Sequence, residues 1–248
     1  TAQAGQIWRL GDHRVMCGDS TSAEDVAALM DEKKADLVLT DPPYNLAQDS
    51  PLVAQCSSAK NYTKMIDAGW DEGFEPIKFI SNLPDAIKEN CFVLVFTSHR
   101  LFGEIIDIFE DMFKKSGHLV WCKTNPMPSL MKVTWTHATE LIAFSRVGKP
   151  VFNFPKTGHC FNYIVSTKQP RTDHPTAKPI DLLSELIEQS TKKESSVLDL
   201  FLGSGSTLIA CEQTGRKCYG MELSPAYCDV IIRRWEDFTG QTAELVNG

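Results

Sequence analysis

Short apolar runs alternate with amphipathic stretches along this chain of 248 residues, and this alternation predicts a doubly wound α/β fold. Seven of the runs have the length of strands, so we expect a mostly parallel, seven-stranded sheet with helices on both faces. Signals at helix ends support this prediction, because Gly215 follows one expected helix and Ser224-Pro225 precedes another.

The expected strands occupy these apolar runs in chain order: residues 15–17, 36–40, 91–96, 118–122, 140–145, 196–200 and 217–221. The expected helices lie between them: residues 23–30, 76–88, 101–114, 179–190, 206–213 and 225–238. Residues 151–154 and 161–165 suggest a small additional hairpin. The polar stretch 45–73 is a long loop, of a kind that is usually functional.

The composition narrows the class of protein. Hydrophobic residues make up 42% and charged residues 23% of the chain, as in ordinary globular proteins. No apolar run approaches the roughly 18 residues that a membrane-spanning helix needs. The eight cysteines form no C-x-x-C pair, which favours reduced, mostly buried thiols in a cytosolic protein over a disulfide framework or a zinc site.

The charge is unevenly distributed. The whole chain carries a net charge of −7, yet residues 114–178 contain ten basic side chains and only two acidic ones. Such a basic segment is typical of a face that contacts phosphates, although a solvated basic surface would look the same. If this segment binds a nucleic acid, the candidate contacts are Lys123, Lys132, Lys149 and Lys156.

A glycine turn, Phe201-Leu202-Gly203-Ser204-Gly205, follows the apolar run 197–200. Its glycines permit positive φ angles and close approach of the backbone to a ligand. Glu222 ends the next strand, where its carboxylate can accept the hydroxyls of a ribose. The third glycine of a dinucleotide fingerprint is missing, since Leu208 takes its place, and this disfavours a nicotinamide cofactor. The alternative is a tight strand-to-helix turn with a solvated carboxylate.

A second loop, Asp41-Pro42-Pro43-Tyr44, follows the strand 36–40. Ligands of open α/β sheets bind at such carboxyl ends. The prolines remove two N–H donors and leave carbonyl acceptors, while Asp41 adds a charged acceptor and Tyr44 a flat ring. This combination suits a planar base whose amino group is held by its two N–H bonds. A structural turn with a helix-capping Asp41 remains an equal alternative on these residues alone.

The D-P-P-Y and F-x-G-x-G motifs, with Glu222 behind the second, resemble the S-adenosylmethionine-dependent amino methyltransferases of DNA. The stretch 123–128, K-T-N-P-M-P, and the stretch 174–179, H-P-T-A-K-P, resemble two further segments of that family. The catalytic motif comes before the cofactor motif, which is similar to the β-type order. The resemblance implies a Rossmann-like methyltransferase sheet with a small target-recognition insertion.

The resemblance also implies roles for single residues. The base-holding residues would be Asp41, Pro42, Pro43 and Tyr44. The cofactor-binding residues would be Asp19, Thr176, Lys178, Asp199, Phe201, Gly203, Ser204, Gly205 and Glu222. Within this second set, Thr176 and Lys178, together with His174, would face the methionine part, Glu222 the ribose and Asp19 the adenine. Asp19 also suits a helix N-cap.

The family implies a reaction in which a methyl group passes from S-adenosylmethionine to an amine of a flipped base in double-stranded DNA, with no metal. Aspartate at position 41 resembles the N6-adenine subgroup, so adenine is the expected target. The alternatives are an N4-cytosine enzyme, a methyltransferase of RNA or protein, and a non-catalytic nucleic-acid-binding module.

The resemblance implies one catalytic domain over residues 1–248. Its catalytic half is expected at about 15–146, the recognition insertion at about 124–135 and 147–173, and the cofactor-binding half at about 174–238. We expect a cytoplasmic, nucleoid-associated enzyme of bacterial or phage origin, in a restriction-modification setting. Residues 5–13 resemble the start of methyltransferase halves in fused polypeptides, which leaves room for an upstream domain.

Overall fold

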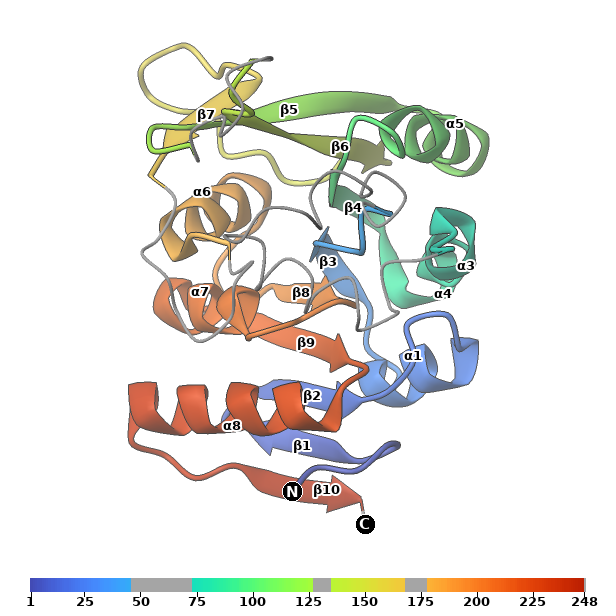
Figure 1. Cartoon of the computed structure of the whole chain (residues 1–248), viewed down its shortest axis with the longest axis vertical. Coiled ribbons are helices and arrows are strands. Elements are labelled where there is room, and N and C mark those ends of the chain that lie inside the picture. The colour runs from blue at the N-terminus through green and yellow to red at the C-terminus, as the bar shows by residue number, and fades with distance from the viewer. Residues whose placement is uncertain (46–72, 127–134, 168–177, 248) are drawn as a thin grey trace, which may run out of the picture.

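The computed structural model describes residues 1–45, 73–126, 135–167 and 178–247. Within these residues all strands join one ten-stranded sheet (Figure 1), in the order β10-β1-β2-β9-β8-β3-β4-β6-β5-β7. The α/β fold class predicted from the sequence is confirmed, although the sheet has ten strands in the described residues where seven were expected.

The strands of the first half of the chain are β1 Ile7–Leu10, β2 His13–Cys17, β3 Ala35–Thr40, β4 Ile87–Thr97 and β5 Ser116–Lys123. Those of the second half are β6 Thr139–Val147, β7 Tyr163–Ser166, β8 Ser196–Asp199, β9 Lys217–Glu222 and β10 Glu244–Asn247. The helices are α1 Ala23–Met30, α3 Pro76–Ile80, α4 Leu83–Ala86, α5 Phe102–Phe113, α6 Ile180–Ser190, α7 Ser206–Thr214 and α8 Pro225–Thr239.

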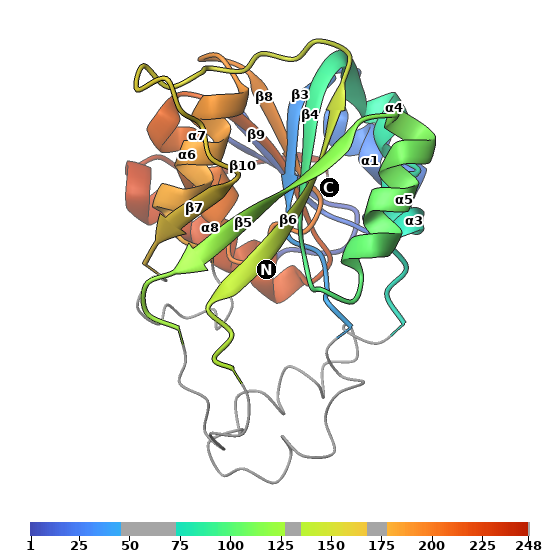
Figure 2. The ribbon, with the colours of Figure 1, turned by 90° about the horizontal axis from the view of Figure 1, so that it is seen from above.

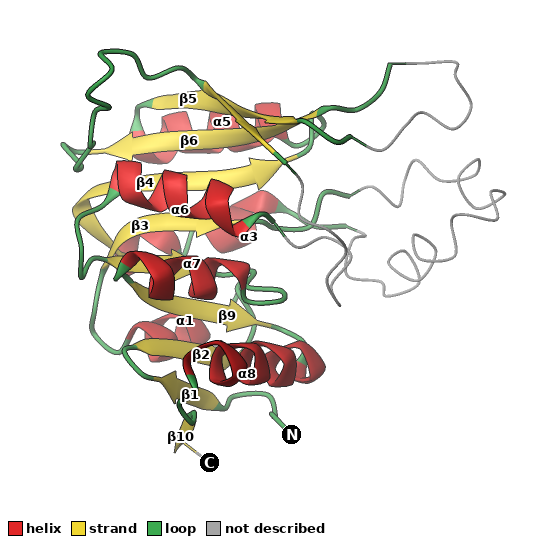
Figure 3. Cartoon of the chain, turned by 90° about the vertical axis from the view of Figure 1, so that its left-hand side faces the viewer, coloured by secondary structure: helices red, strands yellow, loops and turns green. Residues whose placement is uncertain are grey.

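Five central strands, β2, β9, β8, β3 and β4, are parallel to one another. Their carboxyl ends therefore meet at one edge of the sheet, and the arrowheads of β4 and β9 point to the same side in Figure 3. β6 runs antiparallel to β4 and β5, so its end lies at the opposite edge. The ligand-binding side of the molecule is thus the carboxyl edge of the five parallel strands.

Helices cover both faces of the sheet, as the sequence predicts (Figure 2). On one face, α1, α3, α4 and α5 bury a core that includes Val26, Phe79 and Ile105. On the other, α6, α7 and α8 bury a core that includes Leu208 and Trp235. The burial of both sheet faces explains why the central strands are apolar along their whole length rather than alternating.

Two expectations are wrong. The predicted helix 76–88 is divided into α3 and α4, and β4 already begins at Ile87. Pro84, which lacks an N–H donor, can occupy only the first turn of a helix, so it starts α4 instead of continuing α3. The predicted hairpin does not form either, because β7 pairs in parallel with β5, while Asn153 binds the end of α6 through its backbone N–H to Gln189 O at 2.8 Å.

The two unpredicted strands, β1 and β10, have four residues each and mixed polarity, with sequences IWRL and ELVN, whereas β7 overlaps the expected run 161–165. The seven described cysteines are free thiols, and five of them are buried. Among the described residues, no helix combines the length and the apolar character needed to cross a membrane.

Candidate active site

We name the two loops predicted to carry the chemistry by their predicted roles: the base-holding loop is 41–44 and the cofactor loop is 201–205. They lie next to each other, because β3 and β8 are paired in parallel. Asp199, at the end of β8, joins them: its Oδ1 accepts Thr40 Oγ1 at 2.7 Å and Phe201 N at 3.1 Å. Burial raises the pKa of Asp199 to about 6. Its side chain is used to hold the two strand ends together, so the structure places Asp199 beneath the cofactor loop rather than at its surface.

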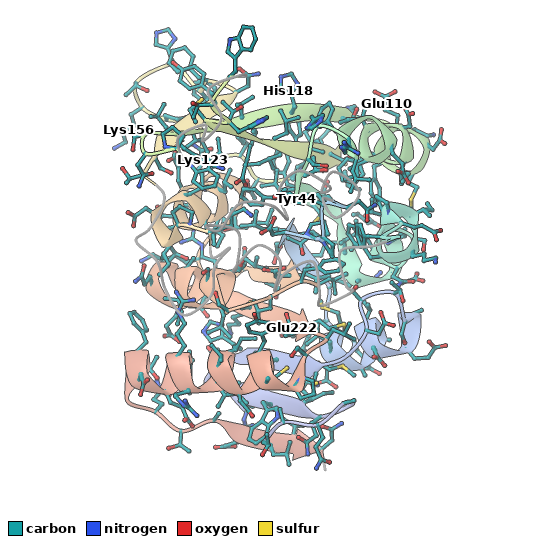
Figure 4. All side chains as sticks on the ribbon, viewed as in Figure 1. Tyr44, Glu110, His118, Lys123, Lys156 and Glu222 are labelled. Carbon is teal, nitrogen blue, oxygen red and sulfur yellow. The ribbon has the colours of Figure 1, made fainter. Side chains whose placement is uncertain are left out.

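Five charged or polar side chains meet at the carboxyl edge: Asp41, Tyr44, Lys123, Glu140 and Lys178. Tyr44 donates its hydroxyl to Asp41 Oδ1 at 2.6 Å, and Lys178 pairs with Asp41 Oδ2. Glu140 binds Lys123 at 2.6 Å through Oε1, and lies 3.5 Å from both Lys178 Nζ and Tyr44 Oη through Oε2. We call this group the charge cluster. Figure 4 labels Tyr44 and Lys123 within it.

The charges of this cluster shift one another's protonation. Burial raises the pKa of Asp41, and the nearby Lys178 offsets only part of that shift. Burial also raises the pKa of Glu140, but Lys178 and Lys123 more than reverse it, so the net pKa is lowered. Desolvation lowers the pKa of Lys178, yet the two carboxylates raise it overall. The two carboxylates of the cluster therefore balance the charges of its two lysines, and Glu140 is the more acidic carboxylate.

The glycine turn has the conformation that the sequence predicts. Gly203 and Gly205 have φ angles of 55° and 81°, in the left-handed region that favours glycine. Glu222 closes the loop from β9, since one of its oxygens accepts Gly203 N at 2.9 Å and the other Ser224 N at 2.9 Å. Burial raises the pKa of Glu222. Each carboxylate oxygen retains an acceptor lone pair for a ligand hydroxyl.

The loop is supported from α8 by two residues that the motifs in the sequence do not include. Arg234 donates through Nη1 to the carbonyl of Ser204 at 2.8 Å, while Ile231 lies under Gly205 so closely that an added Cβ would meet it at 3.3 Å. On the other side, the Phe201 ring packs edge-on against Phe79 at 5.2 Å. Ile231 and Arg234 are three residues apart and so lie on one side of α8, but this spacing alone does not show that this side faces the loop.

Asp19 lies at the same edge, directly after β2. The backbone N–H of Gly18 donates to the Glu222 carbonyl at 3.1 Å, which brings this turn beside the cofactor loop. Asp19 Oδ1 accepts Thr21 N at 2.8 Å in a local turn. The alternative role of Asp19 as helix cap is wrong, because the N-cap of α1 is Ser22.

The basic residues proposed for DNA are not gathered in one place. Lys123 is only 14% exposed and belongs to the charge cluster. Lys149 follows the end of β6, at the edge of the sheet opposite to Asp41. Lys156 is exposed in the loop after it, three residues beyond the contact of Asn153 with α6. Lys132, like Thr176 and His174, lies outside the described residues.

Lys178, which was expected to face the methionine part of the cofactor, forms an ion pair with Asp41 of the base-holding loop. Glu140 appears in the sequence only as one of two acidic residues in a basic segment. No local pattern distinguishes it, because its partners come from β5, from the loop after β3 and from the start of α6, which only the fold brings together.

The comparisons with known proteins agree with this geometry. The family described as DNA methylase, of N6 and N4 enzymes, matches residues 35–233. The chain belongs to this DNA methylase family. Its curated relatives include the Type II methyltransferase M2.DpnII of Streptococcus pneumoniae, 28% identical with 84% of each chain covered. M2.MboI of Moraxella bovis is 27% identical, with 84% of this chain and 83% of the relative covered.

Solved structures of methylases share the fold. The M1.HpyAVI complex with S-adenosylmethionine superposes with a TM-score of 0.69 at 24% identity, over 89% of this chain and 98% of that one. The cytosine-N4-specific PvuII DNA methyltransferase gives 0.68 at 16% identity, over 93% and 89%. At 24% and 16% identity these structures show the shared fold and do not decide the target base of this chain.

Proposed function

We propose that this DNA methylase transfers a methyl group from S-adenosylmethionine to N6 of adenine in double-stranded DNA, after flipping the base out of the helix. The observation that carries the proposal is the hydrogen bond of 2.7 Å between Thr40 and Asp199. This bond fixes the base-holding loop next to the cofactor loop. The names of the curated relatives favour a Type II restriction-modification setting.

The cofactor loop suits an adenosyl ligand without pyrophosphate. The glycine turn holds a half-buried carboxylate, Glu222, whose remaining lone pairs can accept two ribose hydroxyls. Phe201 and Asp19 flank it at the neighbouring strand ends, and Gly203 and Gly205 leave its floor without side chains. S-adenosylmethionine, when bound, supplies a methyl group activated by a positively charged sulfur.

The residues of the base-holding loop bind the exocyclic amine of the target base and make it more nucleophilic. An exocyclic amine is a weak nucleophile because its lone pair is delocalised into the ring. Asp41 accepts one of its N–H bonds and favours a tetrahedral nitrogen with a localised lone pair. The raised pKa of Asp41 makes this carboxylate a better acceptor for the proton that the amine releases when the new N–C bond forms. Tyr44 orients Asp41 through its hydroxyl.

Adenine is the preferred target because position 41 carries aspartate, as in the N6-adenine subgroup that this loop resembles. Unstacking the base costs a few kcal/mol, which binding in the pocket offsets. The test is incubation with labelled S-adenosylmethionine and unmethylated DNA, followed by mass spectrometry of the nucleosides. N6-methyladenine is expected. N4-methylcytosine would correct the target, and unmethylated DNA would refute the function.

A substitution of Asp41 tests the chemistry itself. Asp41→Ala removes the charged acceptor, and loss of one such preorganised partner typically costs about 2.7–4 kcal/mol in barrier, a fall of roughly 10²–10³ in turnover. Affinity for S-adenosylmethionine, measured by calorimetry, should stay close to wild type. Asp36→Ala is the matched control, because Asp36 is also 26% exposed and paired with a lysine, Lys88, yet lies at the opposite end of β3. Turnover near wild type in Asp41→Ala would contradict the mechanism.

A further inference from the structure

The charge cluster contains a second carboxylate, Glu140, to which the proposed reaction assigns no task. Glu140 lies near the start of β6, opposite Trp121 of β5, and its side chain is 21% exposed. One of its oxygens is bound to Lys123 at 2.6 Å. The other points to Lys178 and Tyr44, at 3.5 Å from each. Glu140 therefore touches two residues that also contact Asp41.

In this structure both oxygens of Asp41 are engaged by the protein itself. Oδ1 accepts the Tyr44 hydroxyl, and Oδ2 pairs with the ammonium of Lys178. The Lys178 side chain is 10% exposed and its Nζ lies 5.0 Å from the centre of the Phe96 ring. An adenine amine that binds Asp41 must therefore share this carboxylate with a buried ammonium group, which neutralises the charge that would hold the amine and crowds the approach to Oδ2.

A displaced Lys178 needs another partner, because a buried charge left unpaired is strongly unfavourable. Glu140 is the carboxylate within reach. Its other oxygen is neutralised by Lys123, and its net pKa is lowered, so it stays ionised and can accept the ammonium without a proton change. The distance of 3.5 Å must shorten by less than about 1 Å to give a full charge-assisted hydrogen bond.

We infer that Glu140 is a positioning residue for methyl transfer, which holds the Lys178 ammonium away from Asp41 while the target amine occupies that carboxylate. This inference rests on the proposed function. Without the charge of Glu140, Lys178 has only Asp41 as an anionic partner in the cluster and excludes the base more strongly. The residue thus acts on base entry, through Lys178, and leaves cofactor binding unaffected.

The first test compares Glu140→Gln with the conservative variant Glu140→Asp and with Asp36→Asn, a partly buried, ion-paired control at the other edge. The single-turnover rate of methylation at saturating cofactor and DNA should fall at least tenfold in Glu140→Gln and recover in part in Glu140→Asp. The control should match wild type, and all variants should bind S-adenosylmethionine as wild type does. A normal rate in Glu140→Gln would overturn the inference.

The second test follows base entry without turnover. The DNA carries 2-aminopurine next to the target adenine. The rise in its fluorescence when the enzyme binds the DNA should be smaller for Glu140→Gln than for wild type. Adding Lys178→Met should restore it, because the competing ammonium is gone. An equally small rise in the double variant would show that Glu140 does not act through Lys178 and would overturn the inference.

A measurement on the free enzyme separates this inference from the proposed function. The pKa of the Lys178 ammonium, followed by NMR with labelled lysine, should be lower in Glu140→Gln than in wild type, because one of its two carboxylate partners has lost its charge. An unchanged pKa would overturn the inference even in an active enzyme. A wild-type protein that methylates no adenine would instead refute the proposed function, whatever the Lys178 pKa does.

Discussion

Glu222 combines two tasks in one carboxylate. Each of its oxygens accepts one backbone N–H, from Gly203 and from Ser224, and so shapes the cofactor loop before any ligand binds. The remaining lone pairs are available to the ligand. Preorganisation of this kind lowers the entropic cost of binding, because the acceptor does not have to be ordered when the ribose arrives.

The variant Glu222→Gln keeps the length of the side chain and one of the two backbone hydrogen bonds, but it removes the charge and replaces one acceptor oxygen by an NH2 donor. A charged hydrogen bond contributes roughly 1.5–3 kcal/mol, so affinity for S-adenosylmethionine should fall by at least tenfold in calorimetry, with little effect on DNA binding. Glu212→Gln is the matched control, since Glu212 also accepts two side-chain N–H groups, from His13 and Trp235, away from the loop. Equal loss of cofactor affinity in both variants would point to a general effect on folding.

At the scale of elements, the sequence predicts well what local chemistry determines. β3 and β8 are recognisable as apolar runs that end in Asp41 and in the glycine turn, and these runs alone are enough to place both loops at strand ends. The strands β1 and β10 escape prediction because they are short and half-polar, and pairing with a neighbour is what makes them strands.

The partners of charged residues cannot be predicted in the same way. Glu140 meets Lys178 only because β6 enters the sheet antiparallel beside β4, a register that no local pattern encodes. The same fold turns Lys123 inward and places Lys149 at the opposite edge. The described basic residues of the segment 114–178 therefore do not form one face, although their number is evident from the sequence.

The hydrogen bond that Thr40 donates to Asp199 couples β3 and β8. The protonation of the Asp199 carboxylate provides a test of this coupling. Burial raises the pKa of Asp199 to about 6, above an unfolded value of about 3.9. The folded protein thus favours the protonated form, and stability from this group is lost as pH rises from about 4 to about 6. Asp199→Asn keeps an Oδ1 for both Thr40 and Phe201 but cannot ionise.

The difference in melting temperature between Asp199→Asn and wild type should therefore increase in favour of the variant as pH rises through this range. Above about pH 7 the difference should stay constant. Methylation activity should be retained, since the hydrogen bonds from Thr40 and Phe201 are kept and only the contact with Thr207 loses a carboxylate acceptor. Thr40→Val removes one donor to the carboxylate, so the pKa of Asp199 should rise. The pH range in which stability is lost should then move to higher pH. A constant difference in melting temperature between about pH 4.5 and 7.5 would contradict a titrating Asp199.

At the scale of the whole molecule, one buried histidine links four elements far from the active site. His13 in β2 accepts Cys218 N of β9 through Nδ1 at 2.9 Å, and its Nε2 lies 2.9 Å from Glu212 of α7. Glu212 also accepts Trp235 Nε1 of α8 at 2.8 Å. Because Nδ1 accepts a hydrogen bond, the ring is neutral with its proton on Nε2, which donates to Glu212.

This network makes the stability of the fold depend on pH. Desolvation lowers the pKa of His13, and Glu212 opposes it only in part, so the folded state binds the proton less readily than the unfolded chain. The stability that neutral His13 contributes is then fully present above about pH 6.5, the unfolded pKa, and falls as pH drops below it.

In denaturant unfolding between about pH 5 and 7.5, His13→Gln should lose this part of the pH dependence, with lower stability at the upper end of the range. His118→Gln, which changes an exposed histidine, should keep the wild-type slope. If wild type and His13→Gln lost stability in parallel as pH falls, the titrating group would have to lie elsewhere in the protein.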